Sequence, residues 1–108
     1  MPQIKVRGIS PEKLCQIGEN LIEELAQLID CPKDHFELEY FQSLAIRGGS
    51  IEAAAPFVEI AWFDRGQELQ DQAAKIITRY VHDLGFADIE LAFTYFKREN
   101  YYENGSHF

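Results

Sequence analysis

Positive charge is scarce in this sequence. Its 108 residues include 10 lysines and arginines against 18 aspartates and glutamates, which gives a formal net charge of −8 at pH 7. A surplus of this sign repels the phosphates of nucleic acids and the headgroups of anionic lipids. We therefore expect a protein that binds neither nucleic acid nor a membrane surface.

Long apolar runs are also missing. No segment approaches the roughly 18 to 20 apolar residues that a membrane span needs. The opening residues MPQIKVRG lack the hydrophobic stretch of a signal peptide. These absences predict a cytoplasmic protein. The length and the 46% hydrophobic content predict one folded domain over residues 1–108.

Cysteine is rare as well, with two residues, Cys15 and Cys31. They fall near opposite ends of a predicted helix, whose rise of about 1.5 Å per residue holds them too far apart for a disulfide. Lone thiols suit a reducing compartment, and we interpret both as small packed residues. The histidines His35, His82 and His107 show no metal-ligand spacing, so we expect no metal and no cofactor.

The first half of the chain has the pattern strand, helix, strand. Alternating apolar and charged residues predict a half-buried strand over residues 3–7. Ser10-Pro11 is typical of a helix start, and apolar residues then recur at helical spacing until the Cys31-Pro32 step ends the helix. Residues 36–41 alternate again and predict a second strand.

The middle of the chain contains a turn and the strongest strand pattern. Arg47-Gly48-Gly49-Ser50 predicts a turn, and residues 53–56 predict a connection of small residues. Residues 57–63 are apolar on both faces and short, which is typical of a central strand.

The last third repeats the helix and strand pattern. A helical stripe follows Asp64, which with its neighbours is a candidate N-cap, and Gly85 is typical of a helix end. Residues 89–96 predict a fourth strand. The Asn104-Gly105 turn predicts a small hairpin in the tail.

This order predicts an α+β fold in which two βαβ units form a four-stranded sheet with two helices on one face. Because the third strand is apolar on both faces, the second face also needs cover, and another copy of the chain is the simplest cover. A ferredoxin-like sheet has the same order of elements and remains the alternative; it would suit a small regulatory or ligand-binding dimer.

Several features together resemble the tautomerase, or macrophage migration inhibitory factor, superfamily. These are Met1-Pro2 opening directly into a strand, two βαβ units, the Gly48-Gly49-Ser50 turn and the tail ending NGSHF. The stretches WFDRGQE and YYENGSHF are most similar to a small uncharacterised bacterial family within it. The resemblance covers nearly the whole chain. It implies a homotrimer whose sheets face one another around a central channel.

The resemblance also implies a catalytic role for Pro2. Removal of Met1 would free its secondary amine, which acts in the superfamily as the general base that moves a proton between carbon and oxygen of an enol or keto acid. An α-amino group has a pKa of about 8, and an apolar pocket or nearby cations lower that pKa toward the working pH. The alternative is a proline that only begins an edge strand.

Other superfamily positions differ here. The lysine that precedes the proline after the first helix is replaced by Cys31. The tyrosine and asparagine of the last strand fall at Glu90 and Ala92. We therefore expect a pocket with different contacts.

Four further residues are candidates for binding a small anionic metabolite. Arg65 follows the third strand where superfamily members line the pocket, and a guanidinium binds a carboxylate through two hydrogen bonds. Arg47 and Arg7 are further cations, and Tyr101 offers a hydroxyl. The alternatives are ion pairs or surface cover for the arginines and a subunit anchor for the tyrosine.

Two hypotheses follow. The first is a trimeric tautomerase that acts on a small enol or 2-keto acid, with Pro2 as the base and Arg65 holding the carboxylate. The second is a catalytically silent trimer of the same fold that binds a metabolite or a protein, because a fold does not determine an activity.

Overall fold

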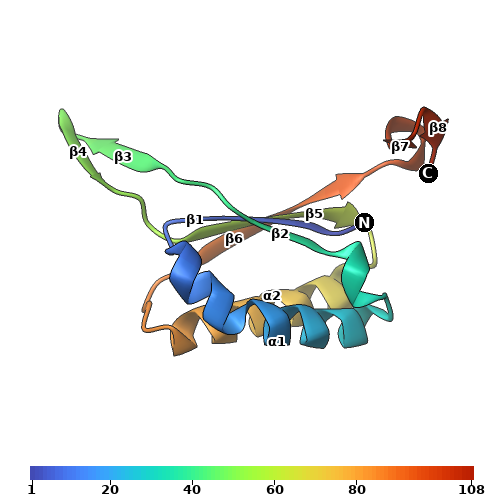
Figure 1. Cartoon of the computed structure of the whole chain (residues 1–108), viewed down its shortest axis with the longest axis horizontal. Coiled ribbons are helices and arrows are strands. Elements are labelled where there is room, and N and C mark those ends of the chain that lie inside the picture. The colour runs from blue at the N-terminus through green and yellow to red at the C-terminus, as the bar shows by residue number, and fades with distance from the viewer.

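A βαβ unit forms the first half of the chain in the computed structural model, which describes residues 1–108. Strand β1 (Gln3–Arg7) leads into helix α1 (Pro11–Ile29). A short 3-10 turn, η1 (Lys33–His35), then precedes strand β2 (Glu37–Tyr40), which pairs parallel with β1. The predicted strand, helix and strand are confirmed (Figure 1).

A second βαβ unit forms from strand β5 (Phe57–Phe63), helix α2 (Gln67–Asp83) and strand β6 (Glu90–Phe96). β5 and β6 pair in parallel, while β1 and β5 pair antiparallel at the centre of a four-stranded sheet of order β2-β1-β5-β6. The two strands of each unit are direct neighbours, so the split arrangement of a ferredoxin-like sheet is wrong for this chain.

Both helices lie on the same face of the sheet, as Figure 1 shows. Between the helices and the sheet lies an apolar core that includes Trp62, Ile60 and Ile4, each at most 2% exposed. Burying side chains of this size contributes about 1.5 to 3 kcal/mol each. The expected α+β architecture, with two helices on one face, is therefore confirmed, and neither helix has the length and hydrophobicity to cross a membrane.

The helix ends follow the predicted signals, and of the residues predicted to cap α2, Asp64 and its neighbours, one is identified. Ser10 caps α1, its hydroxyl accepting a hydrogen bond from the Lys13 N–H at 3.2 Å. Gly85 follows α2 with a φ of 100°. At the start of α2 the N-cap residue is Gly66, not Asp64. The Asp64 carboxylate accepts a hydrogen bond from the Gly66 N–H at 2.9 Å, so it holds the turn before the helix instead of capping it.

A hairpin of strands β3 (Leu44–Arg47) and β4 (Ser50–Ala53) was not predicted as strands. The turn itself was predicted, and Gly48 and Gly49 have φ values of 54° and 82°, which suit a two-residue hairpin loop. The strands escaped prediction because they are four residues long and mostly exposed, so no buried face imposes a clear alternation. Of the residues 53–56 that were predicted as a connection, Ala53 belongs to β4, and residues 54–56 connect β4 to β5.

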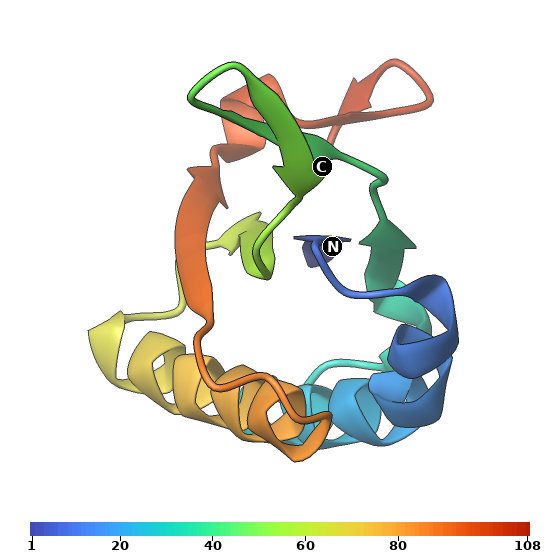
Figure 2. The same ribbon diagram turned by 90° about the vertical axis from the view of Figure 1, so that its left-hand side faces the viewer.

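The tail forms the second hairpin, with β7 (Tyr102–Glu103) and β8 (Ser106–His107) around Asn104-Gly105, and this prediction is confirmed. Figures 1 and 2 show that both hairpins rise on the face of the sheet away from the helices. They lie at opposite ends of the sheet, with the amino terminus at the end of β7 and β8 (Figure 1). That face has no helix over it.

Candidate functional site

Pro2 begins the sheet at the amino-terminal end of β1. Its carbonyl accepts a hydrogen bond from the Glu37 N–H at 3.0 Å, which joins it to β2. Its side chain is fully buried, less than 2% exposed. Pro2 needs no N–H for this pairing, so the residue suits the place whether or not its nitrogen has a chemical role.

Arg65 lies at the same end of the sheet because β1 and β5 run antiparallel. Gln3 pairs with Ala61, so the chain leaving β5 passes the start of β1. The Arg65 guanidinium lies 5.5 Å from the ring centroid of the buried Trp62. Its Nε is buried without a hydrogen-bond partner. A buried donor without a partner is uncommon in proteins, which makes Arg65 a candidate for a ligand contact.

The electrostatics of this corner act on the amino terminus. Burial lowers the pKa of the amine at Met1 below its usual value, and the positive charge of Arg65 lowers that pKa further. Cys31 acts in the opposite direction and raises the pKa of this amine. An amine placed here is therefore neutral at a lower pH than a free amino terminus in water. Pro2 and Arg65, two residues predicted from the sequence, are brought together at one end of the sheet.

Cys31 and His35 complete this corner. Cys31 follows the end of α1, and its Sγ lies 3.5 Å from Nδ1 of His35 on η1 and 3.6 Å from the Pro32 carbonyl oxygen. Cys31 is half-buried and His35 is exposed. Sequence reasoning missed the pair because it interpreted Cys31 as a packed residue and compared the histidines only with one another. The spacing of four residues across Pro32 was the available signal.

Tyr101 also lies at this end of the sheet, within a cluster of aromatic rings. Its ring centroid is 5.5 Å from Phe63, 5.0 Å from Phe96 and 5.1 Å from Phe108. The Phe108 N–H donates to the Tyr101 carbonyl at 2.9 Å, which folds the chain end back onto the cluster. The ring of Tyr101 thus holds the tail against the ends of β5 and β6.

The structure places Arg7 and Arg47 at the opposite end of β1, away from Pro2. The Arg7 guanidinium covers the ring of Phe57 at 4.8 Å. Arg47 forms an exposed ion pair with Glu52, Nε to Oε2 at 3.3 Å, on the β3–β4 hairpin. Both arginines line one shallow hollow with a volume of about 350 Å³. They do not join Pro2 and Arg65.

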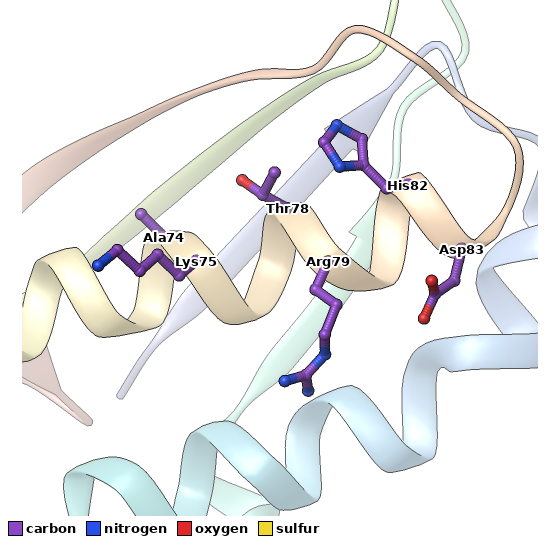
Figure 3. Close-up of a pocket in the computed structure, with 6 residues that line it drawn as sticks. All are labelled: Ala74, Lys75, Thr78, Arg79, His82 and Asp83. Atoms are coloured by element: carbon purple, nitrogen blue, oxygen red, sulfur yellow. The ribbon is translucent and has the colours of Figure 1, made fainter.

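The most spacious hollow, about 510 Å³, lies along the outer side of α2. Figure 3 shows that its side chains diverge: Arg79 points toward α1, whereas Thr78 and His82 point away from it. Arg79 is already bound to Glu24 of α1, Nη2 to Oε1 at 2.6 Å, and this bond holds the pKa of the Glu24 carboxyl below its usual value. Because no group of chemistry-bearing side chains converges there, we place the candidate site at the Pro2 corner.

The family model described as "Domain of unknown function (DUF1904)" matches residues 1–107. The chain belongs to the DUF1904 family. A solved DUF1904 domain from Sebaldella termitidis ATCC 33386 is 32% identical to it, with a TM-score of 0.92 and 100% coverage of both chains. The resemblance to a small uncharacterised family is thereby confirmed. A search of the curated proteins found no match.

More distant solved structures place this DUF1904 chain in the tautomerase fold. A macrophage migration inhibitory factor-like protein from Entamoeba histolytica is 20% identical, with a TM-score of 0.72 and coverage of 99% and 96% of the two chains. Pt0534 inactivated by 2-oxo-3-pentynoate is 15% identical, with a TM-score of 0.71 and coverage of 98% and 94%. A fused 4-OT described as an asymmetric trimer is 12% identical, with a TM-score of 0.76 and coverage of 97% and 94%. These likenesses show the fold.

Proposed function

We propose that this DUF1904 protein transfers a proton within a small enol or 2-keto acid, with Pro2 as the general base. The observation that carries the proposal is the corner at the start of β1, where burial and Arg65 both lower the pKa of the amino terminus. Removal of Met1 would leave the secondary amine of Pro2 in that environment. A neutral amine at pH 7 is what the chemistry requires of the base.

The Pro2 nitrogen would take the proton of the substrate's enol hydroxyl and return it to the carbon next to the one that bears this oxygen, so that the keto acid forms with no net change in protons. The two steps need no cofactor. Arg65 would hold the substrate carboxylate through its guanidinium, whose Nε has no other partner. The inactivation of Pt0534, a protein of the same fold, by a 2-oxo acid supports a small 2-oxo acid as the ligand class.

A homotrimer is part of this proposal. The face of the sheet opposite the helices carries half-buried aromatic residues such as Phe57 and Phe63 and has no helix over it (Figure 2). A second copy of the chain would cover that face, and the fused 4-OT of the same fold is described as a trimer. Neighbouring copies would close the Pro2 corner. The free thiols of Cys15 and Cys31 suit a cytoplasmic location.

The decisive experiment begins with the intact mass of the untagged protein expressed in a bacterial cytoplasm, which shows whether Met1 is removed. The processed protein is then assayed for ketonisation of phenylenolpyruvate. We expect Pro2→Ala to lower kcat, because the primary amine that it exposes lacks the ring that positions the proline nitrogen, and we expect retention of Met1 to lower kcat by about a hundredfold or more, because no basic nitrogen is left at this position. A chain that keeps Met1 is the matched control, since its Pro2 nitrogen is an amide without basicity. Equal rates for all three proteins would rule out Pro2 as the base.

The second candidate function is a silent trimer that binds a small carboxylate without reaction. The complete burial of Pro2 favours it, since a proline this enclosed also serves packing alone. The same assay separates the two functions. Retention of Met1 together with binding of the enol acid and no ketonisation would establish the silent binder.

A further inference from the structure

Two reactive side chains stand beside Pro2 and have no place in the proposed proton transfer. The fold brings them there from different elements. Cys31 follows the end of α1, and His35 is the last residue of η1. Two residues later, Glu37 pairs with Gln3 at the start of β1. The parallel pairing of β1 and β2 therefore holds the pair at the amino-terminal end of β1, the end where Arg65 also lies.

The geometry of the pair suits proton transfer. Sγ of Cys31 lies 3.5 Å from Nδ1 of His35, within the range of a sulfur hydrogen bond. An imidazole at this distance from a thiol is placed to take its proton, and the thiolate is the nucleophilic form of cysteine. Cys31 is also reachable. It is half-buried and lines a hollow of about 450 Å³ at the end of α1, together with the carboxylates of Glu23 and Asp30 and the amine of Lys33.

Arg65 supplies an independent sign of a ligand at this corner. Its Nε is buried without a partner, and so is Nε1 of Trp62, whose ring lies 5.5 Å from the Arg65 guanidinium. The pairing of β1 with β2 on one side and with β5 on the other brings the segments that carry Cys31 and Arg65 to the amino-terminal end of β1. An anion bound to Arg65 would therefore lie within the same corner as the sulfur.

We infer that Cys31 is a second reactive group of the Pro2 corner, a nucleophile that His35 deprotonates and that adds to small electrophilic carboxylates gathered by Arg65. The ligand class rests on the proposed function: a 2-oxo acid whose carbonyl is conjugated to a carbon–carbon double bond. The sulfur lone pair forms a bond to the far carbon of that double bond, and the π electrons move to the carbonyl oxygen. His35 returns the thiol proton to the carbon next to the carbonyl. No oxidant and no leaving group is needed.

The test compares the two cysteines of the chain with two alkylating reagents that differ in charge. Iodoacetate is a small electrophilic carboxylate, and iodoacetamide is its neutral counterpart. Both form a carbon–sulfur bond with loss of iodide. Cys15 is the internal control, because it is a free exposed cysteine on α1. The rate of modification of each cysteine is followed by peptide mass spectrometry on the untagged protein, with the state of Met1 equal in all samples.

We expect the ratio of iodoacetate to iodoacetamide rates to be about tenfold higher at Cys31 than at Cys15, because a nearby cation concentrates an anionic reagent. Arg65→Gln should abolish this preference by lowering the iodoacetate rate more than the iodoacetamide rate, and Arg65→Lys should restore it. His35→Asn should lower both rates at Cys31 by about tenfold, because the thiolate is the reacting form. Thermal melting of each variant verifies folding.

Equal behaviour of Cys31 and Cys15 toward both reagents would overturn the inference, as would an unchanged preference in folded Arg65→Gln. The outcome is separable from that of the proposed function. A protein that fails to ketonise enol acids and still shows the Arg65-dependent preference at Cys31 supports the inference alone. A protein that ketonises them with an unreactive Cys31 supports only the role of Pro2.

Discussion

The two ends of β1 carry similar residue types in different states. At one end, Arg65 stands over a buried ring with its Nε unpartnered, close to an amino terminus whose pKa is lowered. At the other end, Arg7 covers Phe57, and Arg47 forms an ion pair with Glu52. The number of arginines does not distinguish the ends. The amino terminus does, because the charge of Arg65 acts on it, whereas Arg7 and Arg47 contact Phe57 and Glu52. We call the end with Arg7 and Arg47 the structural end.

The largest effect should come from Gly8→Ala, at the structural end. Gly8 has a φ of +81°, and a Cβ there would lie 2.3 Å from the Ala55 carbonyl oxygen. The chain before β5 must move to admit it, so we expect a loss of about 3 kcal/mol in the free energy of unfolding. Denaturant unfolding measures the loss. Gly85→Ala is the control, because its φ is also positive and its Cβ would meet no atom within 4 Å. Equal losses of unfolding free energy in the two variants would show that the positive φ alone causes them, with no contribution from the contact with Ala55.

Replacing the arginine at each end of β1 should show which of the two binds the substrate and which only packs against the protein. Arg65→Gln removes the partner proposed for the substrate carboxylate, so we expect KM for the enol acid to rise at least about tenfold. Arg7→Gln, its matched control at the other end of β1, should leave KM unchanged. Steady-state kinetics on the processed protein provide both values. A larger rise in Arg7→Gln than in Arg65→Gln would move the binding site to the hairpin end.

The pH dependence sharpens the same comparison. Burial and Arg65 lower the pKa of the Met1 amine. If they act in the same way on the Pro2 amine that processing exposes, kcat/KM should rise with pH and level off at a lower pH than it would for an amine without these neighbours. Because the Arg65 charge is one cause of the lowering, Arg65→Gln should shift this acidic limb to higher pH. Arg7→Gln should not shift it. If the acidic limb of the kcat/KM profile stays at the same pH in both variants, Arg65 does not act on the base.

The smallest effect is expected for the Arg47–Glu52 ion pair. Both side chains are more than half exposed. An exposed pair of this kind contributes less than about 1 kcal/mol, and salt screens it. Arg47→Ala should therefore change the melting temperature very little and leave the kinetics unchanged. A clear loss of activity in this variant would show that the hairpin takes part in the site.

Most of the fold was predictable because its signals are local. Ser10 and Pro11 begin α1 where the sequence indicates, and the alternation in residues 3–7 and 89–96 corresponds to β1 and β6. The β3–β4 strands were not predictable, since exposed strands of four residues have no buried face to set a pattern. The N-cap of α2 was predicted as Asp64 or a near neighbour, and the structure has Gly66 there, with Asp64 holding the turn before it.

The candidate site was only partly predictable. Pro2 and Arg65 came from the resemblance, and the structure places them at one end of the sheet through the antiparallel pairing of β1 and β5. Arg7 and Arg47 fitted the same chemical criterion, a cation near the expected pocket. Their partners Phe57 and Glu52 became known only from the fold, because a ring contact and an ion pair depend on side chains brought together in space.

The sequence by itself determined the two βαβ units, because hydrophobic period, caps and glycine turns act over a few residues. It also set the excess of negative charge. Only the tertiary structure decided which polar groups meet. Arg65 came to the amino terminus because the pairing of β1 with β5 gathers segments that lie far apart in sequence. Long-range contacts of this kind have no signature in any local window of residues.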